Sequence, residues 1–159
     1  MEYNANRLHG QCGIVNILPP STNATGSSNL ASDVVALKKY EFADVILTFS
    51  THADAAILTL YKSSDLTTNS TQGIAFNYFY TTQASVDTFT TQYVATTSGI
   101  TLGTVDNQIY HLEVNSEALS SQYPNFYFTL TESTGQTVSG VAILSGRRYV
   151  TQPMPTAIA

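Results

Sequence analysis

The chain has little positive charge and almost no cysteine. Of its 159 residues, 6 are Lys or Arg and 11 are Asp or Glu, and the net charge is −5. Six cations do not make the basic surface that follows a phosphate backbone, which argues against direct binding of nucleic acid. The only cysteine, Cys12, cannot form an intramolecular disulfide. We therefore expect packing or assembly to stabilise the chain.

Long hydrophobic runs are also missing. No segment approaches the roughly 20 apolar residues that a membrane-spanning helix needs, and residues 1–7 lack the regions of a secretory signal. We therefore expect no membrane partner and synthesis in the cytoplasm. The hydrophobic content of 43%, with 10 Tyr and 7 Phe, suffices for one core. Disorder throughout is thus excluded, and one domain is expected.

What the sequence does contain is a strand pattern. Stretches of β-branched and aromatic residues alternate with turn residues at intervals of about 10 to 15 residues, which is typical of an antiparallel sandwich or barrel. We expect an all-β fold, a single antiparallel β-sandwich that is jelly-roll-like, with about eight strands. They are drawn from residues 13–18, 33–39, 43–50, 56–62, 73–80, 88–95, 101–104, 108–115, 125–131 and 138–144.

The segments between the expected strands predict where the strands end and how they are joined. Residues 52–55 and 132–136 have the composition of hairpin loops. Pro19 and Pro20 cannot donate to a sheet and are expected to end the first strand. Ser116 is the expected N-cap of one helical turn at 116–121. Residues 31–62 could instead be partly helical, because Ala, Leu and Lys favour helices.

The sandwich is expected to carry an extended arm at each end. We assign residues 1–30 to an N-terminal arm and linker, 31–150 to the sandwich, and 151–159 to a tail that Pro153 and Pro155 keep extended. An ordered arm usually lies on another subunit.

No pattern of residues predicts a catalytic or metal site. His9, His52 and His111 could be combined with Cys12 and Asp54, but these spacings are common by chance. Asp106 and Glu113 could face one another in a sheet, although a solvated face explains them equally well. Nucleophile elbows and phosphate-binding loops are missing. We expect a protein that is not an enzyme and uses no cofactor or metal.

The aromatic residues allow two interpretations. They can fill the core and subunit interfaces, or exposed tyrosines such as Tyr78 and Tyr127 can stack on sugars. Trp is the stronger stacking platform, and the chain has none. The first interpretation is therefore favoured.

Three segments in the C-terminal half of the chain are similar to segments of a known class of proteins. Residues 107–114, 122–130 and 138–149, the last ending in Val-Ala-Ile-Leu-Ser-Gly-Arg-Arg-Tyr, resemble small virion proteins of tailed bacteriophages, whose last strand often ends similarly. The resemblance implies a capsid decoration or cement protein. Such a protein is a structural, non-enzymatic β-sandwich on the outer surface of the virion, which binds neighbouring subunits of the major capsid protein, often as a homotrimer.

Two surfaces are candidates for partner binding. One contains Ile14, Val15 and Ile17, and the other contains Arg147, Arg148 and Tyr149. The arginine pair can hold a carboxylate through bidentate hydrogen bonds. The alternative function is a carbohydrate- or receptor-binding module of a head or tail fibre.

Overall fold

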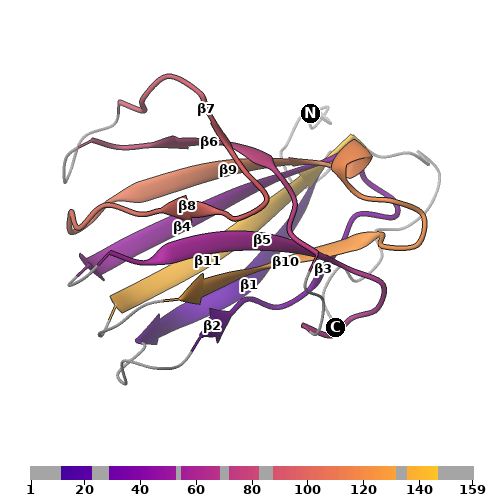
Figure 1. The fold of residues 1–159 in the computed structure, drawn as a ribbon, viewed down its shortest axis with the longest axis horizontal. Helices are drawn as coiled ribbons and strands as arrows, with labels where there is room; N and C mark the ends of the chain where they lie inside the picture. Colours follow the sequence, from indigo (N-terminus) through magenta and orange to yellow (C-terminus); the bar gives the residue numbers. More distant parts are fainter. Residues whose placement is uncertain are drawn as a thin grey trace, which may run out of the picture.

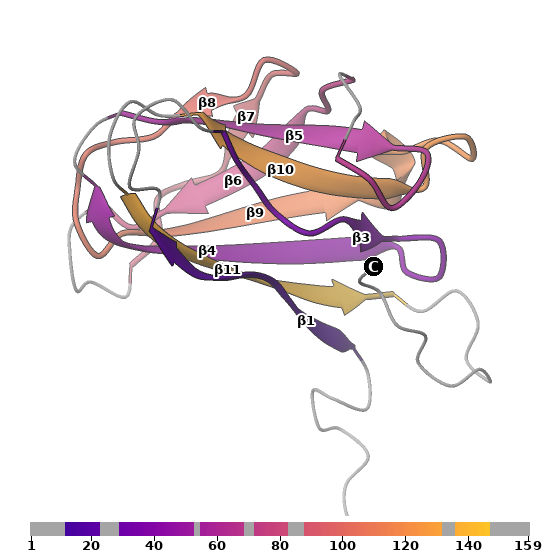
Figure 2. The ribbon, with the colours of Figure 1, turned by 90° about the horizontal axis from the view of Figure 1, so that it is seen from below.

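The chain folds into two stacked antiparallel sheets. The computed structural model describes residues 12–22, 29–52, 55–68, 72–82, 88–131 and 136–146. Within these residues the larger sheet has the strand order β1-β11-β4-β9-β6-β7, and the smaller has β2-β10-β5-β8, with β3 also paired to β10. Figure 1 shows the strands face-on, and Figure 2 shows the two layers from the side. The prediction of an all-β antiparallel sandwich is confirmed.

The strands differ widely in length. In chain order they are β1 (Gly13–Thr22), β2 (Leu30–Ala31), β3 (Val35–Ala36), β4 (Phe42–His52), β5 (Ile57–Ser63), β6 (Phe76–Tyr80), β7 (Tyr93–Ala95), β8 (Ile100–Thr101), β9 (Ile109–Asn115), β10 (Asn125–Thr131) and β11 (Gln136–Ser145).

The strand order is that of a jelly roll. With β2 and β3 counted as one strand and the β6–β7 hairpin set aside, eight strands remain. In chain order, the first, eighth, third and sixth of these strands (β1, β11, β4 and β9) form one sheet. The second, seventh, fourth and fifth (β2 with β3, β10, β5 and β8) form the other. This is the double-sheet arrangement expected from the strand pattern. The β6–β7 hairpin is an addition that widens the larger sheet beside β9.

Both expected hairpins are wrong, as is the helical alternative for residues 31–62. Strand β4 pairs with β11 and β9, whereas β5 pairs with β10 and β8, so the chain crosses between the sheets after β4. Strands β10 and β11 also lie in different sheets. Loop composition indicates that the chain reverses, but it does not determine whether the next strand stays in the same sheet.

Strand β1 corrects two further expectations. It continues through Pro19 and Pro20 to Thr22, because it lies at the edge of the sheet, where a residue without an N–H is tolerated. Its pairing with β11 shifts register between Asn16 and Leu18 and again before Ser21. Residues 13–22 therefore belong to the sandwich and not to an arm. Leu30, which begins β2, also belongs to the sandwich. Residues 1–11, 23–28 and 151–159 of the expected arms lie outside the described residues.

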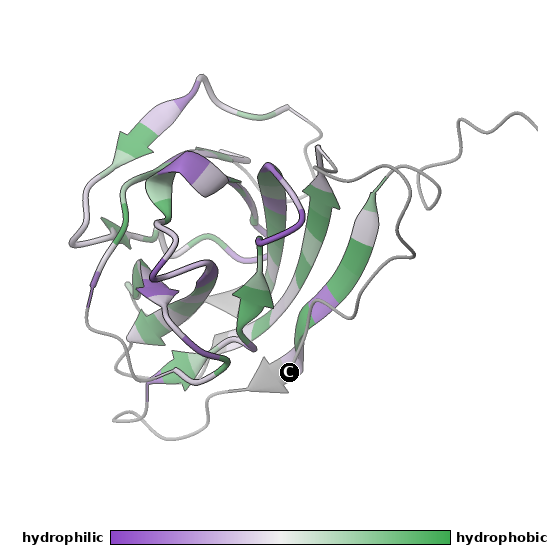
Figure 3. Ribbon diagram, turned by 90° about the vertical axis from the view of Figure 1, so that its right-hand side faces the viewer, coloured by the Kyte–Doolittle hydropathy of each residue, from purple (hydrophilic) through white to green (hydrophobic). Residues whose placement is uncertain are grey.

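Alternation along the strands builds the core. Val45, Leu47 and Phe49 share one face of β4, as predicted, and all three are fully buried. Figure 3 shows hydrophobic residues concentrated in the strands and hydrophilic residues in the connections.

After β9 the chain forms a short 3₁₀ turn, η1 (Ser116–Ala118). Its N-cap is Asn115 and not the expected Ser116, because the Asn115 Oδ1 accepts a hydrogen bond from the Glu117 N–H at 2.9 Å. In the described part of the chain, no helix has the length and apolar character needed to cross a membrane.

Candidate functional site

The predicted partner-binding residues of β1 divide between surface and core. Ile14 is 56% exposed, whereas Val15 is 9% and Ile17 is 0% exposed. Because neighbouring side chains of a strand point to opposite faces, Val15 and Ile17 pack in the core, so the expectation that they contact a partner is wrong. Ile14 remains a candidate. Arg147, Arg148 and Tyr149 lie outside the described residues.

The chain enters β1 and leaves β11 at the same corner of the sandwich. Gly13, the first residue of β1, pairs with Leu144 near the end of β11. Figure 2 shows the two strands side by side along one edge. The first and last described residues, Cys12 and Gly146, therefore flank the same corner, although they are far apart in sequence.

A group of three tyrosines, which we call the tyrosine platform, lies where the larger sheet extends beyond the smaller one. It consists of Tyr78 and Tyr80 of β6 and Tyr93 of β7. Tyr78 and Tyr80 are cross-strand partners of the buried Leu112 and Tyr110, so they continue the inner face of the sheet. Figure 1 shows β6 and β7 at the upper edge, beyond β8. The platform is thus half-exposed, and Tyr93 is 42% exposed.

The platform is a continuous stack of rings. The ring of Tyr93 lies 5.5 Å from that of Tyr78 and 5.8 Å from that of Tyr80, with interplanar angles of 27° and 28°. Tyr80 stacks in turn on the buried Tyr110 at 5.5 Å. Burial raises the pKa of Tyr78 and of Tyr80 above the ordinary tyrosine value, and the neighbouring Tyr93 raises both further. The hydroxyl groups therefore stay protonated at neutral pH.

Tyr127, the second tyrosine considered for stacking on a sugar, is part of the core, in agreement with the favoured interpretation of the aromatic residues. It is 2% exposed, its hydroxyl donates a hydrogen bond to the Thr68 carbonyl at 2.9 Å, and its ring stacks on Tyr61. A ring covered in this way cannot stack on a ligand, so the alternative of sugar stacking does not hold at Tyr127.

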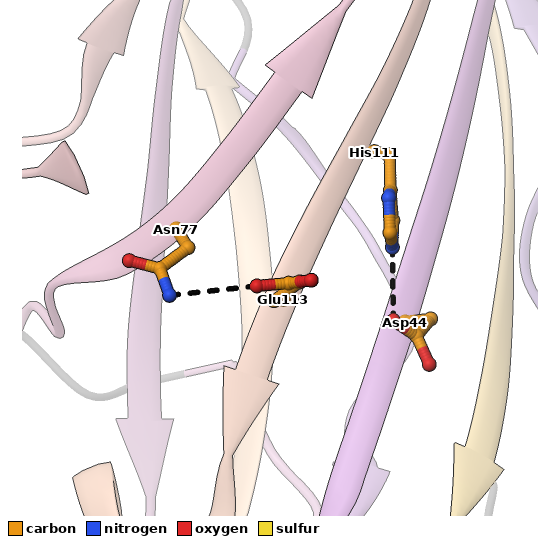
Figure 4. A network of polar contacts seen from close by, with 4 residues as sticks. All are labelled: Asp44, Asn77, His111 and Glu113. Carbon is orange, nitrogen blue, oxygen red and sulfur yellow. Dashed lines mark hydrogen bonds and ion pairs between the residues drawn. The ribbon is translucent and has the colours of Figure 1, made fainter. Parts of the chain in front are cut away.

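A second group of side chains, which we call the polar cluster, lies on the outer face of the larger sheet. It contains Asp44 of β4, His111 and Glu113 of β9, and Asn77 of β6 (Figure 4). The Asp44 Oδ1 lies 2.8 Å from the His111 Nε2, and the Asn77 Nδ2 donates to the Glu113 Oε2 at 3.4 Å. Register brings them together, because Glu113 is the cross-strand partner of both Asp44 and Asn77.

The polar cluster was missed from the sequence because its members are far apart there. Asp44 and His111 are separated by 67 positions. Of the two interpretations of Asp106 and Glu113, the one in which they face one another in a sheet does not hold, because Asp106 lies in the turn before β9. Of the histidine combinations considered, only His111 and the buried Cys12 have described side chains. His9, Asp54 and the side chain of His52 lie outside the described residues.

The rings of two phenylalanines hold the imidazole of His111. Phe79, its cross-strand partner on β6, stacks on it with centroids 5.5 Å apart and an interplanar angle of 19°. Phe89 approaches edge-on at 6.4 Å. Beside the cluster is an open recess of about 320 Å³, lined by residues that include Asp44, Asn77 and Glu113. The cluster can thus hold a positively charged or hydrogen-bonding ligand.

Comparisons with models of known protein families and with curated proteins find no match for this chain. What the protein does must therefore be inferred from its own residues and their geometry.

Proposed function

We propose that this protein is a non-enzymatic structural protein of a tailed-bacteriophage virion, which decorates the capsid and stabilises it by binding subunits of the major capsid protein. The observation that carries the proposal is the shared corner at which the described part of the chain enters β1 and leaves β11. The resemblance of residues 107–114, 122–130 and 138–149 to small virion proteins of such phages supports it. So does the fold, because jelly rolls are used in viral capsids.

The edge strand offers the contact surface. Among the described residues, β1 pairs with β11 alone, so its other edge faces outward. Such an edge can accept a strand from another chain by β-augmentation. Ile14 adds an exposed apolar side chain on this strand. Arg147 and Arg148 follow β11 in sequence after Gly146, and they are two of the six Lys and Arg residues of an acidic chain.

The composition suits repeated assembly. Only 11% of the residues are charged, so uncharged polar surfaces can meet with little repulsion. A hydrogen bond contributes about 1 kcal/mol, and such contacts add up when one subunit binds several neighbours on a shell. The proposed location is the outer capsid surface, after synthesis in the bacterial cytoplasm, and the proposed assembly is a homotrimer.

Co-sedimentation with capsids tests the proposal. The full chain is mixed with expanded capsids of the same phage that lack this protein, and we expect it to pellet with them. Ile14→Asp should weaken binding at least about tenfold by placing a charge in the contact. Ile57→Asp, on β5 of the other sheet and 45% exposed, is the matched control and should bind normally. Failure of the wild-type protein to pellet would refute the proposal.

A second candidate function, a carbohydrate-binding module of a head or tail fibre, is favoured by the tyrosine platform. Half-exposed aromatic rings beside hydroxyl groups can stack on a sugar and hydrogen-bond to it. If this is the function, Tyr93→Ala should abolish binding on an array of host glycans. Tyr123→Ala, a half-buried tyrosine outside the platform, should leave binding unchanged. An array without any bound glycan would exclude this candidate.

A further inference from the structure

Three potential metal ligands of the polar cluster converge on the outer face of the larger sheet. One ligand atom each from Asp44, His111 and Glu113 can be chosen so that all lie within 4.8 Å of one another. Figure 4 shows the imidazole pointing toward Asp44, with Glu113 beside it on β9. A tetrahedral ion with bonds of about 2.0 to 2.1 Å needs donors about 3.3 Å apart, so small rotations of the carboxylates suffice.

The backbone holds these donors in place. Strands β4 and β9 pair over seven consecutive residue pairs, of which Asp44 with Glu113 is one. Stacking on Phe79 fixes the plane of the His111 ring, and the edge of Phe89 closes a second side. Donors on regular strands with a supported imidazole lose little freedom when an ion binds.

The carboxylates of the cluster have no Lys or Arg partner among the described residues. The cluster contains two carboxylates, and the only ion pair in the described part of the chain is that of His111 with Asp44. The side chains of His111 and Asp44 are 25% and 37% exposed, so an ion can reach them from the adjoining recess. A divalent cation would balance both carboxylates and replace the hydrogen bond between Asp44 and His111.

We propose that Asp44, His111 and Glu113 form a binding site for a divalent transition-metal ion. An imidazole nitrogen combined with two carboxylate oxygens suits ions such as Zn²⁺, whereas Ca²⁺ and Mg²⁺ prefer oxygen ligands alone. Three protein ligands leave a fourth position open to water or to a group of a partner. This inference does not depend on capsid binding and stands or falls separately from it.

Calorimetric titration of the full chain with Zn²⁺ tests the site. We expect one ion to bind per chain, with Mg²⁺ binding far more weakly. His111→Ala and the isosteric Glu113→Gln should each reduce the affinity for Zn²⁺ at least about tenfold. A variant with both His9→Ala and His52→Ala removes the other two histidines and is the matched control, which should bind as the wild type does.

Nuclear magnetic resonance of the unmutated protein provides a readout that does not depend on the folding of a variant. Addition of Zn²⁺ should shift the imidazole signals of His111 and leave those of His9 and His52 in place. Absence of Zn²⁺ binding would overturn the proposal. So would binding that survives both substitutions in the cluster, or binding that shifts only the signals of the other histidines.

Discussion

The hydroxyl of Tyr110 joins two points of the segment between β8 and β9 through one buried and one partly buried hydrogen bond. It donates to the Gln108 Oε1 at 3.0 Å and accepts from the Gly103 N–H at 3.1 Å. Gln108 is itself buried, and its amide donates to the Thr81 carbonyl. One side chain thus satisfies groups on both sides of it, and removing it leaves them without a partner.

Tyr110→Phe tests this network. Loss of the hydroxyl leaves a buried acceptor and a partly buried donor unsatisfied, so we expect the free energy of unfolding to fall by about 1 to 3 kcal/mol. Urea denaturation measures it. Tyr61→Phe is the control, because no hydrogen bond of its hydroxyl is seen among the described residues, and the expected change is below about 0.5 kcal/mol. Equal stability of both variants would contradict the account.

The tyrosines also predict a dependence on alkaline pH. Burial is the main cause that raises the pKa of Tyr110, Tyr78 and Tyr80 above 10.0, although the Gly103 N–H opposes it at Tyr110. The unfolded chain then loses these protons first, so stability is complete below about pH 10 and falls as the pH rises further. The urea concentration at the midpoint of unfolding should decline as the pH rises above about 10, and it should decline less steeply in Tyr110→Phe. The same decline in both proteins would contradict a role for Tyr110.

At the scale of the strand, β1 tests whether residues 13–22 belong to the sandwich. Ile17 is fully buried and Ile14 is 56% exposed on the same strand. Ile17→Ala should lower the free energy of unfolding by about 2 to 5 kcal/mol, because it leaves a cavity in the core. Ile14→Ala should change it by less than about 0.5 kcal/mol. Similar values for both substitutions would show that β1 does not pack as described.

Strands are the part of this fold that the sequence predicts well, and their partners are the part that it does not. The alternation of apolar and polar residues identified the buried face of β4. It also identified two buried residues near the start of β6, namely Ile74, which precedes the strand, and Phe76, which begins it. It could not show that β4 and β5 lie in different sheets, because each strand has the same pattern whichever neighbour it pairs with. The polar cluster was hidden for the same reason, since only register makes Glu113 a neighbour of Asp44.

At the scale of the whole molecule, the shared corner of β1 and β11 is the main functional clue. A jelly roll whose edge strand begins beside the end of its last strand can contact several neighbours from that corner. If this corner serves a threefold site on the shell, the free protein should assemble as a trimer. Light scattering after gel filtration measures the mass, and a monomer at all concentrations would contradict the proposed trimer.

The central claim is that the protein decorates a capsid, and a reconstruction of the intact phage particle tests it most directly. The account predicts density for the jelly roll on the outer surface, in many symmetry-related copies, with the β1–β11 corner against the major capsid protein. The opposite result is a particle whose outer shell lacks this density, or one in which the protein occurs only in a tail or head fibre.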